Sequence, residues 1–249
     1  MIKGIYTSAL GLIPLQKKLE VVANNLANTN TTGFKRDNAF DNELISASSL
    51  LRDGTVDPTE KDVNEMTTTD FSQGTLQQTN NPLDVAIDGQ GFFEVETADG
   101  VRLTRDGSFS LSTDGSLVTR EGGSVMGTGG PIRIDDVDQI QASQLVIQKD
   151  GTIKAGDKIY GQLNIVAPGN LDQISKDGQN QYVLASGGSL HEVDPSSATI
   201  RQGYLEGSNV NPVDELIAMI QLQSNFEAGQ KAIQSQDSSL DRANQVGQV

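Results

Sequence analysis

A chain of 249 residues is long enough to bury a sizeable core and to hold one or two domains. Its net charge of −15 argues against nucleic acid and anionic membrane as partners. It has no cysteine, which excludes disulfide frameworks and cysteine-based metal sites, and no apolar run approaches the roughly 20 residues that a membrane span needs.

The first predicted element is a helix over about residues 3–28, because apolar residues recur there every seven positions. These heptad residues are Ile5, Leu12, Leu19 and Leu26. Pro14 either kinks the helix or separates a short turn from a main helix that starts near Ile13. Asparagines Asn24, Asn25 and Asn28 close the helix; their amides either fix the register of a helix seam or mark a fraying end.

The middle of the chain is predicted to be β-structure. Phe34 is an apolar anchor after the first helix, and residues 37–80 are polar and lack a core-forming period, so we expect an extended connector there. Beyond residue 81, apolar and polar residues alternate between Asp-Gly pairs, which are strong hairpin signals. The first pair, Asp88-Gly89, is predicted to be a turn between strands at 83–87 and 92–96, and the further pairs begin at Asp99, Asp106, Asp114, Asp150 and Asp177. The further expected strands are 101–104, 108–112, 116–119, 131–134, 144–148, 152–155, 159–166 and 181–185, in a small barrel or an open curved antiparallel domain.

A second long helix closes the chain. Asn211 can cap it, Pro212 suits its first position, and acidic residues Asp214 and Glu215 suit its positive end. Its heptad residues are Met219, Phe226, Ile233 and Leu240, flanked by Leu216 and Ile220. Residues 1–36 are mainly basic and residues 207–249 mainly acidic, so charge favours pairing of the two ends, within one subunit or between neighbours.

The predicted fold class is therefore α+β, with N- and C-terminal helices forming a coiled-coil base and a central, mainly antiparallel β domain. The expected organisation is a helix over 1–36, a connector over 37–80, a β domain over 81–205 and a helix over 206–249.

The sequence contains few residues or motifs that indicate an enzyme. His191 is the only histidine and falls in a polar stretch, and zinc motifs, P-loops and dinucleotide-binding fingerprints are absent. A hydrolase with paired carboxylates would suit the many acids, but the chain lacks tryptophan and has few other aromatic platforms for a glycan. We expect no enzyme activity, no cofactor and no metal.

Several motifs resemble those of bacterial flagellar axial proteins, the rod, hook and hook-associated subunits. They are Ala23–Asn28 with Gly33–Arg36, Asn81–Phe93, Thr104–Phe109, and Leu205–Asn211 with Glu215–Ile220. The resemblance implies a structural subunit of the basal-body rod, in the periplasm, whose partners are itself, other axial proteins and the type III export apparatus. It implies neither nucleic acid binding nor membrane insertion. Length and tail resemble a proximal rod subunit, with a distal rod or hook-type subunit as the alternative.

The heptads and these motifs together predict an assembly interface. Its residues are Ile5, Leu12, Leu19, Asn24, Asn25, Leu26, Asn28, Phe34, Asn209, Asn211, Leu216, Met219, Ile220, Phe226, Ile233 and Leu240. A secreted adhesin with a trimeric stalk is the alternative from another class; it predicts a stable trimer in isolation.

Overall fold

The computed structural model describes residues 2–39, 67–135, 144–178, 180–185, 187–194 and 197–246. The chain divides into two compact units. The helical unit comprises Met1–Thr29, Arg36–Phe71 and Val210–Val249, and the β unit comprises Asn30–Lys35 and Ser72–Asn209. All strand pairings among the described residues are antiparallel, so the predicted α+β class with a mainly antiparallel β domain is confirmed.

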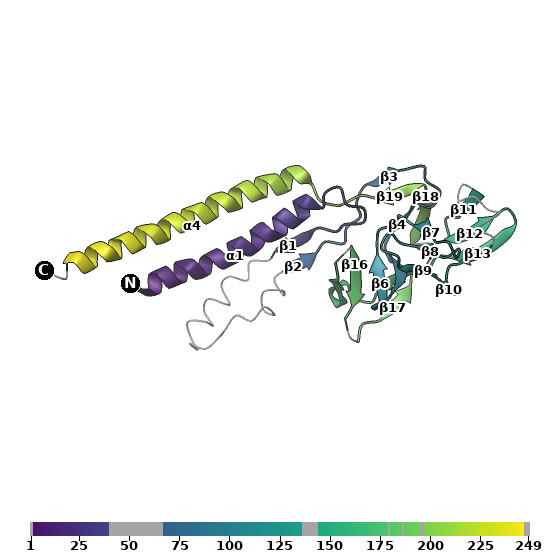
Figure 1. Cartoon of the computed structure of the whole chain (residues 1–249), viewed down its shortest axis with the longest axis horizontal. Coiled ribbons are helices and arrows are strands. Elements are labelled where there is room, and N and C mark those ends of the chain that lie inside the picture. The colour runs from purple at the N-terminus through teal and green to yellow at the C-terminus, as the bar shows by residue number, and fades with distance from the viewer. Residues whose placement is uncertain are drawn as a thin grey trace. The chain divides into compact units, whose positions relative to one another are not determined.

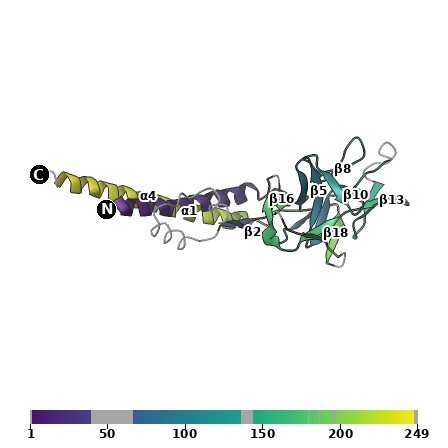
Figure 2. The same cartoon turned by 90° about the horizontal axis from the view of Figure 1, so that it is seen from below.

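Two long helices dominate the helical unit: α1 (Ile2–Ala27) and α4 (Pro212–Val246). They run side by side in opposite directions (Figures 1 and 2). A Cβ placed on Gly229 of α4 would lie 2.6 Å from Leu12 Cδ2, so the missing side chain lets α1 approach closely. A small sheet of β1 (Asp37–Ala39) and β2 (Thr67–Thr69) completes the unit.

The helix ends follow the local rules of capping. α1 is one helix through Pro14, although proline leaves one turn without its backbone donor. At the start of α4, the Asn211 side-chain oxygen accepts a hydrogen bond from the Val213 amide at 3.1 Å, as the sequence predicts. No helix within the described ranges combines the length and apolarity that a membrane crossing requires.

The β unit is built from short strands joined mostly by tight turns. They are β3 (Leu76–Gln78), β4 (Val85–Gly89), β5 (Phe92–Thr97), β6 (Gly100–Thr104), β7 (Ser110–Leu111), β8 (Leu117–Val118), β9 (Ser124–Gly127), β10 (Gly130–Pro131), β11 (Leu145–Ile147), β12 (Thr152–Ala155), β13 (Lys158–Gln162), β14 (Ile165–Pro168), β15 (Ile174–Lys176), β16 (Gln181–Leu184), β17 (Leu190–Glu192), β18 (Ala198–Gln202) and β19 (Tyr204–Glu206), with a 3-10 turn at Leu171–Gln173.

These strands form four sheets. The largest has the order β15-β16-β6-β5-β9-β8-β7, with β10 beside β9, β14 beside β5 and β17 beside β14. β11, β12 and β13 form a second sheet, and the pairs β18-β4 and β19-β3 form two more. The described ends of the main order, β15 and β7, do not pair, so of the two predicted alternatives the open arrangement is the one observed.

One apolar core lies between these sheets. Its buried members are Leu83, Val85, Ile87, Phe93, Phe109, Leu117, Val125, Ile132, Ile134, Leu145, Ile147, Ile153, Leu163, Ala198 and Ile200. The rings of Phe93 and Phe109 meet edge to face, 5.1 Å between centroids.

Four of the six Asp-Gly pairs beyond residue 81 close hairpins as predicted. The Asp99 pair joins β5 to β6, and the Asp114 pair joins β7 to β8. The Asp150 pair joins β11 to β12, and the Asp177 pair joins β15 to β16. Asp88-Gly89 instead forms the last two residues of β4, which pairs with β18. The prediction of a hairpin is also wrong for Asp106-Gly107. There the Val85 amide donates to the Gly107 carbonyl oxygen at 3.0 Å, and a Cβ on Gly107 would lie 1.7 Å from the Val85 carbonyl oxygen. This glycine permits close backbone approach rather than a turn between paired strands.

The predicted strand 159–166 is also wrong, because the chain changes partners within it. β13 pairs with β12, whereas β14 pairs with β5 and β17. Between them Leu163 is buried, and the Asn164 amide donates to Glu94 Oε2 at 2.6 Å. Alternation along a sequence does not reveal a change of partner strand. In the β unit, strands β3, β9, β15, β17, β18 and β19 fall outside the predicted set for the same reason, since tertiary pairing makes them.

Candidate assembly interface and its supporting ion pairs

The heptad residues of α4 form the less exposed stripe of that helix. Met219, Phe226 and Ile233 are half-buried, as are Leu222 and Gly229, while their neighbours are mostly exposed. These positions alternate by three and four residues and therefore share one face. On α1 the heptad residues Leu12, Leu19 and Leu26 are likewise half-buried.

A second apolar stripe on α4 is exposed to solvent. Leu216 is 46% exposed and Ile220 is 62% exposed. Val213 and Ile217, at 60% and 49%, lie on the same side, since the spacing is three, four and seven residues. The sequence groups Leu216 and Ile220 with the heptad seam, whereas the structure places them outside its half-buried stripe. Ile5 and Leu240 lie on the helices, but their side chains are outside the described part of the chain.

The asparagines at the end of α1 have different roles. The Asn25 side chain is buried, donates to the Asp37 carbonyl oxygen at 2.8 Å and accepts from the Asp37 amide at 3.0 Å. It therefore ties the end of α1 to the start of β1. Asn24 is exposed, and its backbone carbonyl accepts from the Asn28 side chain at 2.9 Å, which satisfies a group at the helix end.

Phe34 and Asn209 lie in the β unit. Phe34 is buried, with Lys176 Nζ 4.2 Å from its ring centroid. The Asn209 amide donates to the backbone oxygen of Ser72 at 3.2 Å and to its hydroxyl at 3.1 Å. Both residues therefore hold chain segments together within this unit.

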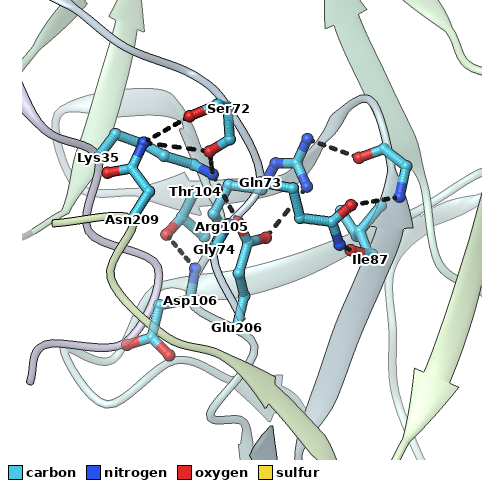
Figure 3. Close-up of polar contacts among 11 residues, drawn as sticks. Lys35, Ser72, Gln73, Gly74, Ile87, Thr104, Arg105, Asp106, Glu206 and Asn209 are labelled. Atoms are coloured by element: carbon cyan, nitrogen blue, oxygen red, sulfur yellow. Dashed lines mark hydrogen bonds and ion pairs between the residues drawn. The ribbon is translucent and has the colours of Figure 1, made fainter. Parts of the chain in front are cut away.

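A buried charge cluster centres on the carboxylate of Glu206 (Figure 3). Its Oε1 accepts from Lys35 Nζ at 2.5 Å and from the Gly74 amide at 2.9 Å, and its Oε2 accepts from Arg105 Nη1 at 3.1 Å. The side chains of Lys35 and Glu206 are fully buried, and that of Arg105 is 5% exposed. Four chain segments thus meet at one carboxylate.

The surroundings of Arg105 complete this cluster. Its Nη2 donates to the Gly89 carbonyl oxygen at 2.9 Å, and its guanidinium carbon lies 5.2 Å from the Phe92 ring centroid. Burial lowers the pKa of Arg105, and the adjacent Glu206 carboxylate opposes that shift.

A related ion pair lies in the helical unit. Arg36 Nε is 2.6 Å from Glu215 Oε1, and Glu215 is buried in the first turn of α4. The Glu215 amide also donates to the Asn211 carbonyl oxygen. The consecutive residues Lys35 and Arg36 therefore pair with glutamates in different units.

Sequence reasoning missed this cluster because charged residues are rarely buried. A signal was nevertheless available: Lys35, Arg105 and Glu206 each stand in a different motif of the family resemblance. The structure shows that three separate motifs converge on one ion network.

The described residues show few groups that could bind a metal ion or catalyse a reaction. No group of three histidine or acidic side chains among them could hold a metal ion. His191 is exposed and lies on β17.

Comparisons with known proteins agree with this reading. Three family models match, described as "Flagella basal body rod protein" over residues 5–35, "Flagellar hook protein FlgE/F/G D1 domain" over 86–155 and "Flagellar basal body rod FlgEFG protein C-terminal" over 201–246. A flagellar basal-body rod protein FlgF of Caulobacter vibrioides is 34% identical, over 92% of this chain and 91% of its own. A FlgG of Bacillus subtilis is 33% identical, over 96% of this chain and 97% of its own.

These matches span both helices and the β unit, and the matching families and relatives are structural proteins rather than enzymes. The chain therefore belongs to the FlgF and FlgG family of flagellar basal-body rod proteins, structural subunits of the rod.

Proposed function

We propose that this subunit polymerises through α1 and α4 into the rod, as a proximal subunit of the FlgF type. The two helices form the coiled-coil base of the assembly, and residues 81–205 form the body that it carries. The chain reaches the periplasm through the flagellar type III export apparatus and joins other axial proteins there, without binding nucleic acid or entering a membrane.

The exposed apolar stripe of α4 carries this proposal. Val213, Leu216, Ile217 and Ile220 leave a continuous apolar face in water within one chain. Such a face gains free energy by burial, about 25 cal/mol per Å² of apolar surface. A neighbouring axial helix, whose own seam follows the same heptad, is the surface that we expect to cover it.

The half-buried seam contributes in a second way. Phe226 and Ile233 occupy heptad positions whose burial is incomplete in the single chain. Head-to-tail contacts between subunits generate a filament when they do not close into a ring. The same helix contacts repeated from subunit to subunit therefore build a tube. The asparagines of the predicted interface that lie at the helix ends, Asn24, Asn25, Asn28 and Asn211, position the ends of the helices that make these contacts.

The test compares Ile220→Asp with Gln221→Asp, an adjacent exposed residue, in the full-length chain. Ile220→Asp should abolish association in sedimentation experiments and motility in cells that depend on this subunit. Gln221→Asp should leave both intact, and neither should alter thermal unfolding of the β unit. Normal motility with Ile220→Asp would contradict the role of this stripe.

Phe226→Ala tests the seam in the same assays. It should prevent rod completion without lowering the melting temperature of the β unit, whereas Gln230→Ala should do neither. An adhesin with a trimeric stalk would instead form a stable trimer at low concentration, which sedimentation would also detect.

A further inference from the structure

The β unit carries an unpaired basic and apolar face on the sheet β11–β12–β13. Val146 pairs with Lys154, and Lys154 pairs with Ile159, so the three side chains form one row across the sheet. Val146 is 46% exposed and Ile159 is 67% exposed, whereas Leu145, Ile147 and Ile153 on the other face are buried in the core. We call this row the basic face.

Its charge differs from that of the molecule as a whole. Lys149, Lys154 and Lys158 outnumber Asp150 and Asp157 in these strands and turns, while the whole chain has a net charge of −15. The Lys158 ammonium lies above the Tyr160 ring, with Nζ 4.9 Å from the ring centroid. Among the described residues Lys154 has no ion-pair partner, so its ammonium is available to an acidic group.

A matching acidic face lies at the tip of the β5–β6 hairpin. Val101, which is 45% exposed, pairs directly with the exposed Glu96, so both point to the same side of the sheet. Asp99 is exposed in the intervening turn. The nearest basic residue in sequence, Arg102, pairs with Asp177, with Nε 2.5 Å from Oδ2, and its Nη1 also donates to the Asp99 carbonyl oxygen at 3.1 Å. In the adjacent turn before β9, Arg120 and Glu121 offset each other's charge.

The two faces lie apart within the β unit. The basic face lies on the sheet β11–β12–β13, whereas the acidic face lies on the β5–β6 hairpin of the largest sheet. Each face combines exposed aliphatic side chains with charge of one sign, and the signs are opposite.

We propose that the basic face Val146–Lys154–Ile159 docks onto the acidic face Glu96–Asp99–Val101 of a second copy of this chain. The contact is head-to-tail, because the two faces differ and a face meeting its own copy would bring like charges together. It rests on the proposed assembly function, to which it adds a lateral contact between β units that the helices do not make.

The absence of cysteine from the sequence allows a direct test with the full-length chain. Ile159→Cys and Val101→Cys are prepared separately, mixed, concentrated until sedimentation shows association, and oxidised. The mixture should give at least about ten times more disulfide-linked dimer than either variant alone. Circular dichroism confirms that both variants are folded, since both substituted side chains are exposed.

Reversing one charge on each face then tests whether opposite charges hold the two faces together. Adding Lys154→Glu to the Ile159→Cys chain should reduce the mixed dimer about tenfold, and adding Glu96→Lys to the Val101→Cys partner should restore it. Lys149→Glu makes the same change of net charge in the turn outside the row, and it should alter the yield less than about twofold.

The outcomes separate this contact from the assembly function. Association without the mixed dimer, equal yields in single-variant samples, or equal effects of Lys149→Glu and Lys154→Glu would overturn the contact alone. A disulfide between Ile159→Cys and a different axial protein in isolated basal bodies, without the mixed dimer, would also overturn it. Failure of the unmodified chain to associate at any concentration would overturn the proposed function and this contact with it.

Discussion

Lys35 and Glu206 form a fully buried ion pair, with Nζ 2.5 Å from Oε1, although they lie 171 positions apart in the chain. Removing two charges from water is costly, and their mutual attraction repays the cost only when further hydrogen bonds satisfy the remaining donors and acceptors. Here the Gly74 amide and the Arg105 guanidinium supply those bonds to the carboxylate. The cluster therefore fastens the segment Asn30–Lys35 to the rest of the β unit.

Glu206→Gln should destabilise the β unit strongly. The substitution leaves the Lys35 and Arg105 cations buried without their carboxylate, and breaking such a buried pair costs about 3–5 kcal/mol of unfolding free energy. Urea denaturation followed by circular dichroism measures the change. Asp88→Asn is the control, because Asp88 pairs with Arg201 at 2.6 Å but both side chains are more than a third exposed. Its effect should stay below about 1 kcal/mol, and equal losses would refute the role of the cluster.

Asn25→Ala should loosen the junction between α1 and β1. It removes both hydrogen bonds to the Asp37 backbone and leaves that backbone unsatisfied, at a cost of about 1–3 kcal/mol. Hydrogen exchange at the Asp37 amide should accelerate. Asn24→Ala keeps the backbone carbonyl that Asn28 uses, so it should leave this amide protected. Unchanged exchange in Asn25→Ala would show that the side chain does not hold β1.

Gly107→Ala should be among the most damaging substitutions in the β unit. The new Cβ would lie 1.7 Å from the Val85 carbonyl oxygen, so β4 or the segment after β6 must move. We expect a loss of about 3 kcal/mol or more in unfolding free energy, the upper range for overpacking. Gly129→Ala meets no atom within 4 Å and should change stability by less than about 1 kcal/mol. Thermal denaturation measures the melting temperatures of both variants. Similar values would contradict the close approach of Gly107 to the Val85 carbonyl oxygen.

Asp114 should titrate at unusually low pH. Hydrogen bonds from Ser116 and Ser112 lower the pKa of its carboxyl group, because they favour the charged form. A lowered pKa in the folded state means that this stabilisation is present above the ordinary aspartate pKa and is lost as pH falls through the lowered pKa. Ser116→Ala should raise the pKa of Asp114 in an NMR titration, whereas Ser124→Ala on β9 should not. No difference between the variants would show that the Ser116 hydroxyl is not a donor to this carboxylate.

The limits of the β unit can be tested with two fragments. Residues 72–209 retain Glu206, Gly74 and the β3–β19 sheet, whereas residues 81–205 lack all three and leave Arg105 without its carboxylate. We therefore expect fragment 72–209 to melt at a higher temperature than fragment 81–205. Both fragments lack Lys35, so identical melting temperatures would mean that neither the β3–β19 sheet nor the contacts of Glu206 with Gly74 and Arg105 contribute to the stability of this body.

The sequence by itself determined the features that depend on near neighbours. The cap at Asn211, the heptads of the terminal helices and four Asp-Gly hairpins each follow from residues within a few positions of one another. The family motifs are equally local, and they identified a flagellar axial protein before any contact was known.

Only the tertiary structure decided how distant segments combine. Glu206 meets Arg105 across 101 positions and Lys35 across 171, and no period or local spacing encodes such a pairing. The Asp106-Gly107 pair is typical of a hairpin turn, yet Gly107 instead allows the Val85 backbone to approach closely. Likewise the heptad gave a stripe on α4, but α1 alongside decided that Phe226 is half-buried while Ile220 is exposed. The physical reason is that burial is a property of the packed neighbours, whereas periodicity is a property of the chain alone.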